Sequence, residues 1–147
     1  MAIKQITPCE AKESLEKNEG YVYLDVRSEE EFEKGRPTDS INIPLKQLNQ
    51  EFRMLQDNPD FVAVVEANFS KDAKLIVGCA SGPRSQMACE MLEGVGYEDL
   101  ANVVGGYSGA RDMVGNLTQE GWVQLGFPTA SGEAGEQGYS ALQKKSK

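Results

Sequence analysis

Residues 74–85 read KLIVGCASGPRS, and this stretch of the chain decides the fold. Its first five residues are an apolar run of the kind that forms a buried strand, and the next five form a tight loop. From Arg84 onward the apolar residues recur at helical spacing, and Pro83 suits the first position of that helix. Ligands bind at the carboxyl ends of strands in open parallel sheets. The segment therefore predicts a strand, a ligand-binding loop and a helix, with Cys79 at the turn.

The hydrophobic pattern outside this segment predicts further strands and helices. Strands are expected where β-branched and aromatic residues cluster, at residues 21–26, 40–43 and 100–104. Helices are expected after the start signal Thr7-Pro8 and over residues 28–34, 47–56 and 59–69. Strands that alternate with helices predict an α/β fold, in which helices cover both faces of a mostly parallel sheet.

The composition excludes several classes of function. Fifteen Lys and Arg against 23 Asp and Glu give a net charge of −8. This charge disfavours nucleic-acid and anionic-membrane partners, because both need a basic surface. The chain has no histidine, which rules out a Ser–His–Asp triad, a Cys–His pair and a histidine-ligated metal. No metal site is expected.

The length and the cysteine count suggest how the chain is organised and where it resides. We expect one domain over residues 6–129 and, because the composition becomes rich in Gly, Ser and Gln, a flexible C-terminal tail over residues 130–147. Three cysteines, an odd number, favour a reduced intracellular context. Residues 1–19 lack the apolar core of a signal peptide, and no apolar run approaches the ~20 residues that span a bilayer. The protein is therefore expected in the cytoplasm or in a plastid, with no targeting segment in this chain.

Cys79 is the predicted nucleophile. Loop amides, the positive end of the following helix and the charge of Arg84 all favour a thiolate over a thiol. A thiolate needs no histidine base, which agrees with the composition. Pro83 has no N–H, so the donors left to form a cradle are the amides of Ala80, Ser81, Gly82, Arg84 and Ser85. The alternative, from the residues alone, is a loop cysteine beside a helix cap with no chemistry.

Several motifs, taken together and in order, resemble those of a known family. They are LDVRSEEEF at 24–32, Gly35, SINIP at 40–44, IVGCASGPRS at 76–85, VGGYS at 104–108 and GFPT at 126–129. The chain is similar to single-domain rhodaneses, the thiosulfate sulfurtransferase family, and above all to the small plant-type members.

The resemblance implies a five-stranded, mostly parallel rhodanese-like fold and a sulfurtransferase activity. Cys79 would take the sulfane sulfur of thiosulfate or a similar donor as a persulfide, with no other cofactor. A thiol, cyanide or a protein would then accept the sulfur. Asp25 and Arg27 match a pair that supports the active-site side of the sheet, and residues 80–84 match the cradle around the sulfur.

The chain departs from the family pattern at three positions. Arg36 stands where the family usually has histidine, Asp39 where it has glycine, and Ala110 near the usual place of a tryptophan. We expect Arg36 to add positive charge at a solvent-exposed rim of the pocket. With Arg84 in the loop, this favours the compact dianion thiosulfate over mercaptopyruvate as donor.

Two other functions are compatible with a Cys–Arg loop. A phosphatase or arsenate reductase is disfavoured, because four residues separate Cys79 from Arg84 and that class resembles a pattern with five. A sulfur-relay or interaction module that hands persulfide to a protein partner without turnover stays open.

The remaining sulfur and aromatic side chains have simpler expected roles. Cys89 lies about 15 Å along the helix from Cys79, too far for a disulfide, and is expected in the core. Cys9 is expected to be a surface or packing thiol. Met87 and Met91 are expected in the core, and Tyr107 and Trp122 are candidates for the pocket wall.

Overall fold

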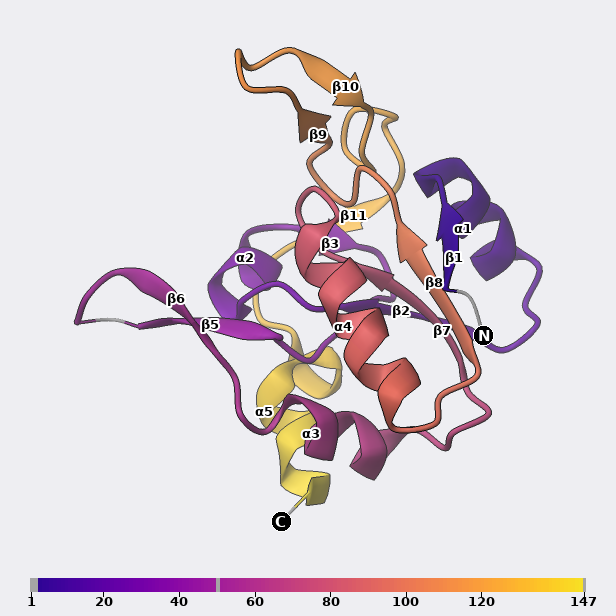
Figure 1. Ribbon diagram of the computed structural model, residues 1–147, viewed down its shortest axis with the longest axis vertical. Coiled ribbons are helices and arrows are strands. Elements are labelled where there is room, and N and C mark those ends of the chain that lie inside the picture. The colour runs from indigo at the N-terminus through magenta and orange to yellow at the C-terminus, as the bar shows by residue number, and fades with distance from the viewer. Residues whose placement is uncertain (1–2, 50, 147) are drawn as a thin grey trace.

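A five-stranded, all-parallel sheet forms the centre of the computed structural model, which describes residues 3–49 and 51–146 (Figure 1). In spatial order its strands are β1 (Lys4–Ile6), β8 (Asp99–Val103), β7 (Lys74–Gly78), β2 (Tyr21–Asp25) and β4 (Ile41–Asn42). The expected α/β class and parallel sheet are confirmed. The edge strand β1 was not expected, because its three residues are too few to show a pattern.

Helices cover both faces of the sheet, as the alternation of strands and helices predicts. They are α1 (Pro8–Glu16), α2 (Glu29–Lys34), α3 (Phe61–Asn68), α4 (Pro83–Gly94) and α5 (Tyr139–Gln143), with short 3-10 turns at Gly135–Gln137 and Lys144–Ser146. In β7, Leu75 and Val77 pack into the core cluster that contains side chains of α3, α4 and α5, whereas Ile76 packs into the cluster that contains Ala11 of α1. The period of two along a strand thus fills two separate cores.

The first two helices begin at the residues that the sequence predicts. The Thr7 side chain accepts the amide of Glu10, the carboxylate of Glu10 accepts the amide of Thr7, and Pro8 takes the first helical position. Ser28 and Glu31 form the same reciprocal pair at the start of α2. These capping boxes satisfy amides that a helix start leaves without partners.

The helix expected at residues 47–56 is wrong. The segment forms an antiparallel hairpin of β5 (Lys46–Asn49) and β6 (Met54–Asp57), with residue 50 outside the described residues. The Asn49 side chain accepts the amides of Glu51 and Phe52, and Arg53 adopts a positive φ of 55°, which turns the chain back. Phe52 and Met54 are more than 60% exposed, so no buried face favours a helix here.

Two smaller pairings lie near the end of the sheet where the chain emerges from the strands. β9 (Ala110–Arg111) and β10 (Leu117–Gln119) form a projecting hairpin, and β3 (Arg36–Pro37) pairs with β11 (Thr129–Ala130) (Figure 1). The second pairing joins the segment after α2 to the start of the C-terminal region.

Part of the segment that the sequence analysis expects to be a flexible tail, residues 130–147, packs against the core. Tyr139 and Leu142 of α5 are 6% and 7% exposed and belong to the larger core cluster. The side chains of Asn58 and Asn68 donate to the Tyr139 hydroxyl and the Leu142 carbonyl, each at 3.0 Å. Composition predicted a tail because it does not register the spacing of Tyr139 and Leu142, which lie one helical turn apart. Lys147 lies outside the described residues.

Two further features of the surface bear on the sequence analysis. Met87 and Met91 are 47% and 41% exposed, so their expected place in the core is wrong, and the buried face of α4 is formed instead by Ala88, Cys89 and Leu92. Among the described residues, none of the helices is both long and apolar enough to cross a membrane.

The buried C-terminal helix predicts a stability effect. Replacing Leu142→Ala should lower the free energy of unfolding by about 2–4 kcal/mol, because it leaves a cavity in the core. Leu117→Ala is the matched control, since Leu117 is 38% exposed on the β9–β10 hairpin, and it should cost under about 1 kcal/mol. Urea unfolding would measure both, and equal small effects would show that α5 does not pack on the core.

Candidate functional site

The pairing of β2 with β7 places the site at one edge of the sheet. Asp25 lies opposite Gly78 in the register, and the amide of Val26 donates to the Gly78 carbonyl at 2.9 Å. The residues that follow the two strands, Arg27 and Cys79, therefore emerge at the same carboxyl edge. This is where ligands bind in open parallel sheets.

The thiol of Cys79 lies at the base of the loop between β7 and α4. Its Sγ accepts the amide of Gly82 at 3.1 Å and lies 3.4 Å from the Ser85 hydroxyl oxygen. Cys79, Gly82 and Ser85 are buried, Ala80, Ser81 and Arg84 are partly buried, and Pro83 is exposed. The start of α4 thus directs an N–H donor at the sulfur, and the helix dipole acts in the same direction.

The turn after β8 clamps this loop from the other side. The amides of Tyr107 and Ser108 donate to the carbonyls of Cys79 and Ala80, both at 2.8 Å. Gly106 has a φ of 51°, and a Cβ there would collide with the Cys79 carbonyl oxygen. The Gly-Gly motif of the sequence therefore allows the turn to approach the backbone of Cys79.

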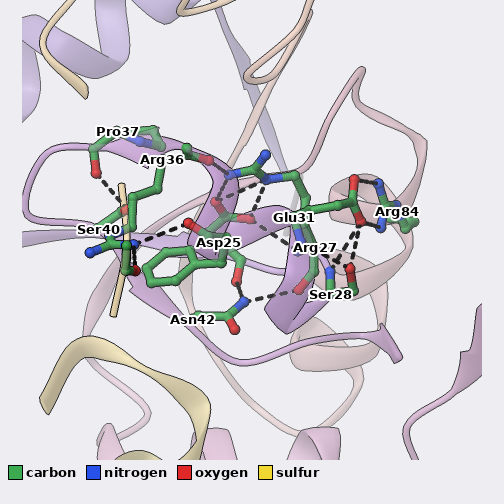
Figure 2. Close-up of polar contacts among 12 residues, drawn as sticks. Asp25, Arg27, Ser28, Glu31, Arg36, Pro37, Ser40, Asn42 and Arg84 are labelled. Carbon is green, nitrogen blue, oxygen red and sulfur yellow. Dashed lines mark hydrogen bonds and ion pairs between the residues drawn. The ribbon is translucent and has the colours of Figure 1, made fainter. Parts of the chain in front are cut away.

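Asp25 and Arg27 form a buried ion pair beside the loop. The Arg27 guanidinium donates to the Asp25 carboxylate at 2.7 Å (Figure 2). It also donates to the Gly35 carbonyl at 2.7 Å and stacks on the Tyr107 ring at 4.3 Å. Both side chains are under 5% exposed. Removing either partner of such a pair would leave an uncompensated buried charge.

Arg84 is held by a carboxylate that the sequence analysis did not assign to it. Its two terminal nitrogens donate to the two carboxylate oxygens of Glu31 at 2.8 and 3.0 Å (Figure 2). Partial burial acts to raise the pKa of Glu31, but the hydrogen bonds and charge of Arg84 and the bonds from Ser28 lower it to about 2. The charge expected to stand free in the loop is therefore paired.

Arg36 is not the exposed rim residue that was expected. It is 5% exposed, it stacks on the Phe32 ring at 4.7 Å, and its guanidinium donates to the carbonyls of Phe32, Gly132 and Glu133. The long side chain reaches the C-terminal segment and satisfies its backbone. Arg36 thus joins α2 to the C-terminal region and presents no solvent-exposed charge to a ligand.

The structure also brings Asn102 of β8 to the site. Its side-chain oxygen lies 2.5 Å from the Ser85 hydroxyl, which in turn lies beside Cys79. Asn102 is 4% exposed. The one signal in the sequence is an amide side chain within an otherwise apolar strand. No comparable signal links Glu31 to Arg84, because their pairing depends on how α2 and α4 meet.

The remaining candidates lie outside the loop. All three cysteines of the chain are free, and Cys89 is fully buried, which raises the pKa of its thiol to about 12. Cys9 is exposed. Trp122 packs edge-on between Tyr23 and Phe127 in the second core cluster and is 3% exposed, so its ring supports the fold. Among the described residues, no three His, Cys, Asp or Glu side chains are arranged to hold a metal.

Comparison with known proteins agrees with this fold. Residues 7–112 match the model of the rhodanese-like domain, so the chain belongs to the rhodanese-like family. It superposes on the crystal structure of Rv0390 from M. tuberculosis with a TM-score of 0.74 at 27% identity, over 90% of this chain and all of that one.

Two plant relatives in Arabidopsis thaliana are closer in sequence. Over 108 residues the chain is 40% identical to the mitochondrial protein High Arsenic Content 1. The aligned stretch covers 74% of this chain and 56% of that protein. Over 110 residues it is 36% identical to the chloroplastic thiosulfate sulfurtransferase 16. This aligned stretch covers 75% of the present chain and 80% of that protein. The chain thus spans little more than half of the first relative.

The Glu31–Arg84 pair predicts a pH-dependent contribution to stability. Glu31→Gln should lower the free energy of unfolding at pH 7 by about 1 kcal/mol, a small value because solvent screens a carboxylate that is a third exposed. Gln keeps an acceptor for the Ser28 amide, so the variant removes mainly the charge. A lowered pKa stabilises the fold above the unfolded value, and this stabilisation is lost as the pH falls toward 2.

Urea unfolding at pH 7, 5 and 3 would test the pair. The difference between wild type and Glu31→Gln should shrink as the pH falls, whereas Glu33→Gln, at an exposed carboxylate on the same helix, should change little at any pH. A Glu31→Gln effect of constant size across this range would contradict the pairing.

Proposed function

We propose that the protein is a thiosulfate sulfurtransferase that carries sulfur as a persulfide on Cys79. The observation that carries the proposal is the amide of Gly82 donating to Cys79 Sγ at 3.1 Å, at the start of α4. Membership of the rhodanese-like family and the similarity to a thiosulfate sulfurtransferase support it.

The first step loads the cysteine. The Cys79 thiolate attacks the outer sulfur of thiosulfate, a new S–S bond forms, and the bond between the two thiosulfate sulfurs breaks. Sulfite leaves with the electron pair of the broken bond, and the enzyme persulfide keeps one negative charge on its outer sulfur.

The second step unloads it. A nucleophile such as cyanide or a thiolate attacks the outer sulfur, and the S–S bond to Cys79 breaks with its electron pair returning to the Cys79 thiolate. Neither step requires a general base, which suits a chain without histidine. No oxidant or reductant is consumed beyond the donor and the acceptor.

The loop stabilises the charge on the transferring sulfur through its backbone. N–H donors fixed by the start of a helix are already oriented before the reaction, so they cost no reorganisation as charge moves. Pro83 contributes no donor, but it fixes the first turn of α4. Because Glu31 already pairs with Arg84, the amides stabilise the charge and Arg84 holds the loop in shape.

Thiosulfate is the proposed donor because the loop around Cys79 is tight. Mercaptopyruvate is larger and carries a carboxylate and a keto group that need their own donors. Arg36 does not contribute to this preference, because its guanidinium is buried against backbone carbonyls.

Mass spectrometry after thiosulfate treatment tests the persulfide. The wild-type protein should gain one sulfur atom on Cys79, and Cys79→Ser should gain none and lose thiosulfate:cyanide activity by more than about 1,000-fold. Cys9→Ser and Cys89→Ala are matched controls that remove the other two thiols, and both should keep the added sulfur. Sulfur on Cys9 or Cys89 with Cys79 unmodified would contradict the assignment.

A substrate panel tests the donor. Thiosulfate, mercaptopyruvate, arsenate and a phosphate ester would be compared by kcat/KM, and arsenate is included because one relative has a name that refers to arsenic. We expect thiosulfate to lead. A tenfold preference for mercaptopyruvate would overturn the donor, turnover of arsenate or the ester alone would overturn sulfur transfer, and a persulfide without turnover would indicate a relay module.

A further inference from the structure

A chain of hydrogen-bonded side chains runs from the sulfur of Cys79 to the protein surface. The Ser85 hydroxyl lies 3.4 Å from Cys79 Sγ and 2.5 Å from Asn102 Oδ1. Beyond Asn102, the side-chain amides continue the chain: Asn102 Nδ2 donates to Gln5 Oε1 at 2.9 Å, Gln5 Nε2 to Gln86 Oε1 at 2.7 Å, and Gln86 Nε2 to Glu90 Oε2 at 3.2 Å. The chain therefore connects α4, β8 and β1.

The far end of this chain fixes its direction. A carboxylate only accepts hydrogen bonds, so the Gln86 amide nitrogen faces Glu90 and its oxygen faces Gln5. The same logic repeats through Gln5 to Asn102, whose nitrogen must face Gln5. Asn102 therefore presents its oxygen, an acceptor, to Ser85.

Ser85 has one proton and three acceptors within reach. Its hydroxyl oxygen lies 2.5 Å from Asn102 Oδ1, 2.9 Å from the Gly82 carbonyl oxygen and 3.4 Å from Cys79 Sγ. The shortest of these distances is to Asn102. With the proton directed there, Ser85 turns lone pairs toward the sulfur, which suits a thiol S–H but not a thiolate.

We propose that Asn102 is a positioning residue that restrains the reactivity of Cys79 through the Ser85 hydroxyl. This inference rests on the proposed function, since it concerns the same nucleophile. When Cys79 is a thiol, its S–H donates to Ser85, and Ser85 donates to Asn102. When Cys79 loses its proton to solvent, the Ser85 hydroxyl stabilises the thiolate only by turning away from Asn102. Asn102 therefore determines how readily Ser85 becomes a donor to the sulfur.

Other ionisable groups that face Cys79 come from each neighbouring element. They are Tyr23 on β2, the Asp25–Arg27 pair after it, Arg84 and Cys89 on α4, and Tyr107 after β8. Burial raises the pKa of Tyr23, Cys89 and Tyr107, so these three stay neutral at ordinary pH. Both arginines are paired with carboxylates. All these groups stay in place when only Asn102 is changed.

The test is the rate of iodoacetamide alkylation of Cys79 as a function of pH, measured in the 147-residue chain without any sulfur donor. Asn102→Leu removes the acceptor and keeps the number and branching of the side-chain heavy atoms. Below the midpoint of the wild-type profile, the alkylation rate of this variant should rise about fivefold, the factor that corresponds to the free energy of one hydrogen bond. The midpoint should move to lower pH. Ser85→Ala removes the hydroxyl through which Asn102 acts, so its rate below the midpoint should stay below that of Asn102→Leu.

The decisive variant is the double one. If Asn102 acts through Ser85, then adding Asn102→Leu to Ser85→Ala changes nothing further. Asn102→Asp keeps an acceptor for Ser85, so its rate should stay at or below that of wild type. Asn68→Leu is the control, because it removes another partly buried amide, on α3, and should leave the profile unchanged.

Two results would overturn the proposal. One is a rise of equal size for Asn102→Leu with and without Ser85, which would mean that the change acts directly on the sulfur. The other is an Asn102→Leu profile that matches wild type. Alkylation of Cys79 needs no sulfur donor, whereas persulfide formation does. The alkylation profiles can therefore support the role of Asn102 when no persulfide forms, and they can contradict it when a persulfide forms, so the two proposals are tested separately.

Discussion

The in-register pairing of β2 with β7 is the constraint on which the site depends. It places Asp25 beside Gly78, so that Arg27 and Cys79 leave the sheet at the same edge. A shift of one residue would exchange the two faces of a strand. The apolar side chains of β7 would then enter the wrong cores, which makes such a shift costly. The packing that stabilises the sheet thus also positions Cys79.

Charge around the loop is neutralised before any ligand arrives. Asp25 pairs with Arg27 in the interior, and Glu31 of α2 pairs with Arg84 of the loop. Because both arginines are engaged, the fixed positive field at the sulfur comes mainly from backbone amides and the start of α4. The fold fixes the orientation of these amide donors, so they do not reorient as solvent dipoles do. The negative net charge of the chain therefore need not determine the electrostatic potential at Cys79.

Asn102 shows how a buried strand can depart from its apolar pattern next to a nucleophile. A buried amide is costly unless it is hydrogen-bonded, and here its two ends are satisfied by Ser85 and Gln5. An apolar residue at this position would avoid the need for both partners. The Asn102 side chain links the loop to β8 and β1 through Ser85 and Gln5. These contacts are the basis of the proposed restraint on the reactivity of Cys79.

Local chemistry in the sequence determined much of this protein. The runs at β2, β7 and β8, the capping boxes of α1 and α2, and the strand–loop–helix segment around Cys79 all form where the pattern predicts. These features depend on neighbours within a few residues, which a sequence displays directly. The motifs also indicated the rhodanese-like family, to which the chain belongs.

Only the tertiary structure decided the contacts between distant segments. The hairpin at β5–β6, the burial of Tyr139 and Leu142, the inward position of Arg36 and the exposure of Met87 and Met91 all differ from expectation. So do the partners of Arg84 and Ser85, which come from α2 and β8. The physical reason is that burial and ion pairing depend on which surfaces meet after the sheet has formed. The sequence determined the strand, loop and helix around Cys79, and the packing of the folded chain determined which groups surround them.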